Sequence, residues 1–246
     1  MLREIAARLS ESLEDDDAAM LRVVLAIFCK VHPDELKAPL SALAHRWYEI
    51  AGPHLEWQAI GANASRLSRA HSDTLNRIEQ EIDVARGDQM MSFLLQGVEA
   101  FAPEFRLKSL VTDHVDNPDQ KWTTLTEIVL PIPSDDASWE ALVQLADDIC
   151  GRFPYDSAYM SPAFLCGDES LEHEAGIAIA PLAMRHHGLD VADNATTCYF
   201  LGRMTRGARW LTFLSNDLAG KGPRVNKSIG FSGLMFDPWI DAAPQL

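Results

Sequence analysis

Hydrophobic residues recur along the chain with two spacings, one typical of helices and one typical of strands. An apolar residue at every third or fourth position places a hydrophobic stripe on a helix, whereas short apolar runs rich in β-branched residues favour buried strands. The first spacing predicts helices over residues 1–17, 34–51, 72–84, 134–153, 170–187 and 206–218. The second predicts strands over residues 20–30, 54–61, 90–98, 105–111, 122–130 and 155–166.

Three prolines lie inside predicted helices or strands and change what we expect of them. Pro39 lies inside the helix predicted over 34–51 and, because proline lacks a backbone donor, indicates a later start for this helix. Pro181 predicts a break or a fresh start in the helix over 170–187. Pro162 interrupts the last predicted strand and is typical of a sheet edge or a β-bulge.

The order of the elements predicts an α+β fold, a mixed sheet with helices packed on it. Strand, helix, strand and helix follow one another over residues 20–84 and again over 122–187. Two interpretations stay open. The chain has two similar halves, 18–120 and 121–246, that share one sheet, or the repeated order is a coincidence.

Length and composition are those of a globular protein. The 246 residues fit one large domain or two small ones, with 47% hydrophobic and 23% charged residues. We expect an acidic N-terminal helix over residues 1–17 and a single α+β domain over 18–246. No apolar run is long enough for a membrane span or a signal peptide, and the four cysteines form no metal-binding pair, so we expect a cytoplasmic protein with reduced thiols.

The net charge narrows the class of partner. The chain has 36 acidic and 21 basic residues and a formal charge of −15. A nucleic-acid-binding protein carries a basic stripe, which this sequence lacks, so we expect no nucleic-acid partner. A partner held by electrostatic attraction is a basic protein, while the alternative interpretation is that acidity only keeps the chain soluble.

Motifs for catalysis or cofactor binding are missing from the sequence. It contains no HExxH, GxSxG, phosphate-binding P-loop or GxGxxG pattern. His186 and His187 are adjacent, and neighbours on a regular helix point about 100° apart, so the pair does not form a metal site there. The sequence therefore predicts no cofactor, no metal and no enzyme, and it leaves clusters of carboxylates as the candidate functional groups.

Three stretches of the chain resemble a known family. They read RWYEIAG, EWQAIG and SDTLNRIEQEI over 46–82, FPYDSAYMSPAF over 153–164, and LAMRHHGLDV with RGARWLTFLSNDL over 182–218. In these stretches the chain resembles the type VI secretion immunity proteins associated with VRR-Nuc nuclease effectors. The resemblance implies a cytoplasmic protein that binds and occludes a cognate toxin, and it carries over no catalytic residues.

Three hypotheses follow for the function. The first is the immunity protein, whose acidic surface would be steered to the basic, phosphate-binding surface of a nuclease. The second is a metal-assisted hydrolase using Asp168, Glu172 and His173, and the third is a scaffold protein without a toxin partner. Under the first hypothesis, the carboxylates expected to contact the partner are Asp113, Asp116, Asp135, Asp136, Asp168, Glu169 and Glu172.

Overall fold

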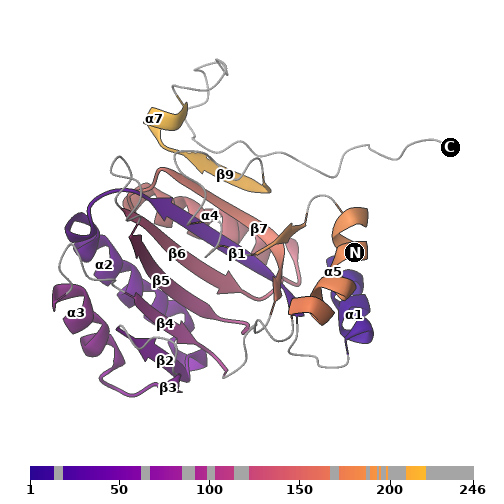
Figure 1. The fold of residues 1–246 in the computed structure, drawn as a ribbon, viewed down its shortest axis with the longest axis horizontal. Coiled ribbons are helices and arrows are strands. Elements are labelled where there is room, and N and C mark those ends of the chain that lie inside the picture. The colour runs from indigo at the N-terminus through magenta and orange to yellow at the C-terminus, as the bar shows by residue number, and fades with distance from the viewer. Residues whose placement is uncertain are drawn as a thin grey trace.

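Figure 1 shows the computed structural model, in which helices and strands are interspersed along the chain. The structure describes residues 1–13, 19–61, 67–84, 92–98, 103–113, 122–166, 172–186, 189–192, 194, 198 and 209–219. The helices are α1 (Leu2–Ser12), α2 (Pro33–Ala51), η1 (Gly52–His54), α3 (Thr74–Val84), α4 (Asp136–Arg152), α5 (Glu172–Arg185) and α7 (Asn216–Ala219). The strands are β1 (Ala19–Cys29), β2 (Trp57–Ile60), β3 (Ser68–Arg69), β4 (Ser92–Gln96), β5 (Arg106–Asp113), β6 (Trp122–Leu130), β7 (Ser157–Cys166), β8 (Asp190–Val191) and β9 (Leu211–Leu214).

The strands form one nine-stranded sheet. Its order is β3-β2-β4-β5-β6-β1-β7-β8, and β9 also pairs with β7. The pair of β7 with β8 is parallel, and the other pairs are antiparallel. The sheet is therefore mixed, and with its helices it confirms the predicted α+β class.

One face of the sheet carries the helices. Successive side chains of a strand point to opposite faces, and in β1 the odd-numbered residues Val23, Leu25 and Ile27 pack with α2, α3 and α4 in the main core. Residues Ala19 and Leu21, of the same parity, pack with α1 and α5 in a second core. Figure 1 shows α1 and α5 at one end of the sheet and α2 and α3 at the other.

The opposite face of the sheet carries a smaller core. The even-numbered residues of β1, Val24, Ala26 and Phe28, belong to it together with side chains from β6 and β7. Cys198 packs against this face and its Sγ lies 3.8 Å from the Thr123 carbonyl oxygen. The central strands are therefore buried on both faces.

Three of the proline-based expectations need correction. Helix α2 begins at Pro33 and runs through Pro39, and α5 runs through Pro181, so neither helix starts late or breaks. Strand β7 is not at the sheet edge, and its register with β1 is continuous across Pro162, so there is no bulge in that pairing. Its other edge is shared by β9, whose first residue Leu211 pairs with Met160, and β8, whose first residue Asp190 pairs with Ala163; Pro162 lies in the gap between them.

Two further predictions differ from the structure. The segment predicted as a helix over 206–218 contains strand β9, and a helix forms only at Asn216–Ala219, because Leu211 and Phe213 alternate into the main core. The helical spacing that predicts the helix over 34–51 includes Ile50 and would place it on the buried face, but 37% of its surface is exposed. The predicted N-terminal helix ends at Ser12, and residues 14–17 lie outside the described part of the chain.

The repeated order of elements is present. The first stretch contains β1, α2, β2 and α3, and the second contains β6, α4, β7 and α5. The strands of the two stretches interleave, since β1 lies between β6 and β7. The division of the chain into two halves stays a prediction.

Candidate partner-binding surface

Helices α2, α3 and α4 cover the same face of the sheet, and we call them the helical layer. Together they contain ten acidic and four basic residues. Each helix buries its apolar stripe in the main core, for example through Leu40, Ile78 and Ile149. An amphipathic helix that buries one face must turn its charged residues to solvent, so the fold concentrates carboxylates on this side.

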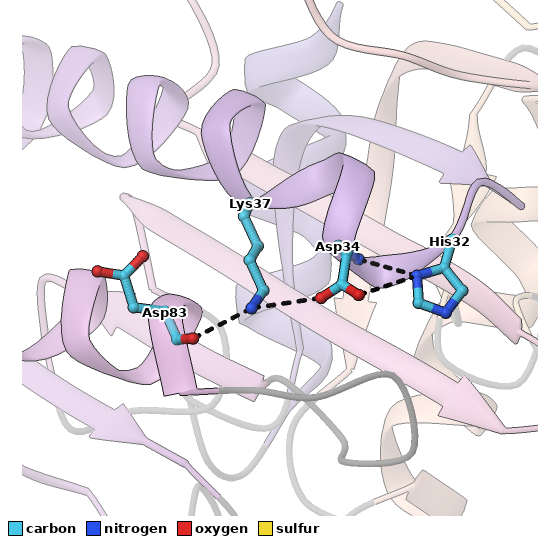
Figure 2. Close-up of polar contacts among 4 residues, drawn as sticks. All are labelled: His32, Asp34, Lys37 and Asp83. Atoms are coloured by element: carbon cyan, nitrogen blue, oxygen red, sulfur yellow. Dashed lines mark hydrogen bonds and ion pairs between the residues drawn. The ribbon is translucent and has the colours of Figure 1, made fainter.

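A chain of polar contacts joins the start of α2 to the end of α3 (Figure 2). Lys37 Nζ lies 3.3 Å from Asp34 Oδ1 and donates to the Asp83 carbonyl oxygen at 3.1 Å. His32 caps α2, since its Nδ1 accepts from the Asp34 backbone N–H at 3.3 Å. Lys37 thus satisfies a carbonyl in the last turn of α3, where a cation is favourable for the helix dipole.

A second contact between the same two helices involves Glu79. Its Oε1 lies 2.7 Å from His45 Nε2 and accepts from Ser41 Oγ at 3.3 Å. The hydrogen bond from His45 lowers the pKa of the Glu79 carboxyl below its ordinary value. Glu79 therefore keeps its negative charge to a lower pH than an isolated glutamate does.

A groove of about 130 Å³ lies between α2 and α4. Its lining combines apolar and charged residues: Pro39, Ala42, Leu43, Arg46, Asp148, Ile149, Arg152 and Phe153. Arg152 Nη2 pairs with Asp148 Oδ1 at 2.6 Å, and Arg46 Nη1 pairs with Glu49 Oε2 at 3.1 Å. The groove has room for one side chain from a partner and a polar rim around it.

Two of the predicted contact residues belong to the helical layer. Asp135 is the N-cap of α4: its Oδ1 accepts from the Ser138 backbone N–H at 2.8 Å and from Ser138 Oγ at 3.0 Å. The backbone hydrogen bond of Ser138 is the main cause that lowers the pKa of Asp135. Asp136 is the first residue of the helix and is exposed.

The other predicted contact residues lie elsewhere. Asp113 pairs with Trp122 where β6 begins, whereas Asp135 and Asp136 follow the end of β6, so the sheet places them at opposite ends of that strand. Glu172 is the first residue of α5. Asp116, Asp168 and Glu169 lie outside the described residues.

The residues of the hydrolase hypothesis are only partly described. Glu172 and His173 open α5, and Asp168 precedes the described part of that segment. Among the residues whose placement is described, no three His, Cys, Asp or Glu side chains gather as metal ligands would.

A buried polar network on the second face of the sheet was not predicted. Arg106 Nη2 lies 2.9 Å from Glu127 Oε1, Asn194 Nδ2 donates to Glu127 Oε2 at 2.7 Å, and Tyr159 Oη donates to Asn194 Oδ1 at 2.5 Å. Glu127 is the one charged residue of β6, whose other residues are apolar or Thr. A charge in a buried strand needs polar partners, so this residue is the sequence signal for such a network. The network ties Asn194 to the central strands.

The fold has a solved counterpart. The chain is similar to a Pseudomonas aeruginosa T6SS protein, PA0821, with a TM-score of 0.67 and 19% sequence identity. The similarity covers 82% of this chain but 58% of that chain, so this chain spans less than two thirds of its length. Among curated proteins, no match to the sequence was found.

The fold class is thus one that occurs in a protein of the type VI secretion system. The sequence defines the family more closely, because residues 40–221 match the family model TsiV, described as type VI immunity for VRR-NUC. The chain belongs to this family. The resemblance drawn from the sequence is confirmed. In the described part of the chain, no helix is both long and apolar enough to cross a membrane.

Proposed function

We propose that this protein is a cytoplasmic immunity protein that binds a VRR-NUC effector through its helical layer and occludes the nuclease without catalysing a reaction. Membership of the family is the first support for this function. The observation that carries the binding mode is the excess of ten acidic over four basic residues on α2, α3 and α4.

Charge complementarity is the physical reason. A nuclease binds the phosphate backbone with Lys and Arg, so the surface around its active site is basic. An anionic surface on the inhibitor accelerates association by electrostatic steering and covers the groups that would otherwise hold nucleic acid. Occlusion of that surface is sufficient for inhibition.

The groove between α2 and α4 provides a short-range contact within this surface. Interfaces obtain most of their binding energy from a few side chains that fill well-packed pockets. Leu43, Ile149 and Phe153 are buried apolar residues of its lining, and Arg46 and Arg152 are exposed basic ones. We propose that an apolar side chain of the effector enters this groove while its basic residues contact the surrounding carboxylates.

Only those predicted contact residues that lie in or next to the helical layer belong to the proposed binding surface. Asp135 and Asp136 lie at the start of α4 and are part of the proposed surface. The contact roles of Asp113, Asp116, Asp168, Glu169 and Glu172 remain predictions.

The test uses the cognate VRR-NUC effector, with association measured by biolayer interferometry at several salt concentrations. The variant Glu140→Lys/Asp147→Lys reverses two exposed charges on α4. We expect its association rate constant to fall about tenfold at low salt and to approach that of the wild type at high salt, because salt screens exposed charges.

The matched control reverses two exposed charges outside the helical layer. Glu4→Lys/Glu11→Lys on α1 changes the net charge by the same amount. Equal losses in both variants would show that only net charge matters and would contradict the proposed surface. Failure of the wild-type protein to bind the effector or to block its cleavage of DNA would contradict the function itself.

A further inference from the structure

The lining of the groove between α2 and α4 changes from apolar to charged with increasing exposure to solvent. Leu43, Ile149 and Phe153 are only 7%, 5% and 5% exposed. The side chains of Arg46 and Arg152 are 55% and 81% exposed. All five residues line the same groove. Buried apolar side chains therefore form its inner part, and the two guanidinium groups lie next to solvent.

The volume of the groove limits the size of the group that it can hold. The groove measures about 130 Å³. An engineered apolar cavity of about 150 Å³ in another protein binds benzene. A groove of slightly smaller volume that is open to solvent therefore accommodates one six-membered ring. A single methyl group would leave most of the space unfilled and would lose the packing contacts of the lining.

Each guanidinium group of the groove is held by a carboxylate of its own helix. Arg152 Nη2 lies 2.6 Å from Asp148 Oδ1, one turn earlier in α4. Arg46 Nη1 lies 3.1 Å from Glu49 Oε2, one turn later in α2. A carboxylate from a partner would have to displace one of these acids, and a cation would have to displace one of the arginines. The group that fits the groove without breaking either pair is therefore neutral.

An aromatic ring suits these two arginines better than an aliphatic side chain does. A partner that covers Arg46 or Arg152 removes water from a charge, and an aliphatic group replaces none of the lost interaction. The face of an aromatic ring is negative and attracts a guanidinium group, which also stacks flat on it. The same contact occurs elsewhere in this chain, where the guanidinium carbon of Arg69 lies 4.3 Å from the ring centroid of Trp57.

We propose that the groove is a site for one aromatic ring, the phenyl or phenol group of a Phe or Tyr side chain of the effector. The ring packs on Leu43, Ile149 and Phe153, and the guanidinium groups of Arg46 and Arg152 cover it. The source of the ring rests on the proposed function, whereas the site belongs to this chain alone. The groove should therefore bind free phenol in the absence of the effector.

The first experiment adds phenol or cyclohexanol to the ¹⁵N-labelled full chain and follows the backbone amide signals by NMR. Cyclohexanol is the matched probe, since it has a six-membered ring and a hydroxyl group but no aromatic face. We expect phenol to shift the signals of groove residues such as Ala42 and Ile149. We also expect phenol to bind about tenfold more tightly than cyclohexanol, because only phenol attracts the two arginines.

Variants of the chain test the location of the site and the role of the arginines. Ala42→Leu fills the groove and should abolish the shifts. Ala38→Leu is the matched control, because Ala38 is an exposed alanine of the same helix that is not among the lining residues. Arg46→Met/Arg152→Met keeps two long side chains without their charges, so phenol should lose its advantage over cyclohexanol. Circular dichroism tests that each variant keeps the fold.

The second experiment asks whether the effector supplies the ring. Each Phe and Tyr of the cognate effector is replaced in turn by Leu, and the affinity is measured by biolayer interferometry. One of these effector variants should bind the wild-type chain about thirtyfold more weakly than the wild-type effector does. The same replacement should have little effect on binding to Ala42→Leu, whose groove is already filled.

The outcomes separate this inference from the proposed function. Phenol that binds no more tightly than cyclohexanol, or shifts that persist in Ala42→Leu, would overturn the aromatic site. Effector variants that all bind as the wild-type effector does would overturn the effector as the source of the ring. An effector that does not bind this chain at all would contradict the proposed function, while the phenol measurement would still decide the site.

Discussion

Arg106 on β5 and Glu127 on β6 form an ion pair on the second face of the sheet, with 14% and 6% of their side-chain surfaces exposed and 2.9 Å between Nη2 and Oε1. The two residues are diagonal neighbours, since Arg106 pairs with Val129 and Glu127 pairs with Lys108. Asn194 donates to the other oxygen of the carboxylate. The pair therefore links two central strands to the segment that contains Asn194.

Removing one partner of this pair should destabilise the protein strongly. In Glu127→Ala, Arg106 keeps its buried charge without the compensating carboxylate, and such losses cost about 3–5 kcal/mol. The double variant Arg106→Met/Glu127→Leu removes both charges, so we expect a smaller loss than for Glu127→Ala. Urea unfolding followed by tryptophan fluorescence measures both. A single variant as stable as the wild type would show that the pair is not buried in solution.

Glu79 should contribute to acid sensitivity. Its folded pKa lies below its ordinary value of 4.5 because His45 hydrogen-bonds the carboxylate. The stabilisation of the folded protein by the contact between His45 and Glu79 is therefore complete above the unfolded pKa near 4.5. It is lost as the pH falls through the lower folded pKa of Glu79. We expect Glu79→Gln to lower stability above that window and to have little effect at the acid end. Urea unfolding of both proteins between neutral and acid pH measures this; a pH-independent difference would argue against the contact.

Two buried cysteines should be unreactive in the folded protein. Burial raises the pKa of the Cys29 thiol to about 11 and that of Cys150 to about 12. Alkylation needs the thiolate and access to it, so neither residue should react with iodoacetamide at mildly alkaline pH until urea unfolds the chain. Mass spectrometry of the peptides measures the alkylation of each cysteine separately. Modification of Cys150 in the native protein would contradict its buried place on the inner side of α4.

Replacing Pro39 should stabilise the protein. Proline inside a helix lacks a hydrogen-bond donor, and alanine is about 3 kcal/mol more favourable in a helix interior. We expect Pro39→Ala to raise the free energy of unfolding by about 1–3 kcal/mol, since proline also restricts the unfolded chain. Pro33→Ala, at the start of the same helix where proline is well accommodated, is the control and should give no gain. Thermal unfolding of the two variants compares them directly.

The sequence predicted some helices and strands correctly and others wrongly. The helix predicted over 34–51 rests on the three- and four-residue spacing of its apolar residues. Four of them are in the main core: Leu36, Leu40, Leu43 and Trp47. Proline rules failed at Pro39 and Pro181, because burial of the helix stripes on the sheet outweighs the loss of one hydrogen bond. The last predicted helix failed because Leu211 and Phe213 pair with β7 and bury their side chains there.

The candidate site was predicted only in part. The excess of acid was visible in the sequence, and Asp135 and Asp136 were placed correctly at the start of a helix. The groove between α2 and α4 could not be predicted, since it joins residues such as Ala42 and Ile149 that are far apart in the chain. The same is true of Arg106 and Asn194, which meet at Glu127 only in the folded sheet.

By itself, the sequence determined the α+β class, most helices and strands, the anionic character and the family, because periodicity, composition and motifs are local properties of the chain. Only the tertiary structure decided that β1 lies between β6 and β7, that three acidic helices share one face of the sheet, and that α2 and α4 leave a groove between them. The physical reason is that strand pairing and helix packing join distant residues, and the free energy that selects those partners comes from burial of the whole core.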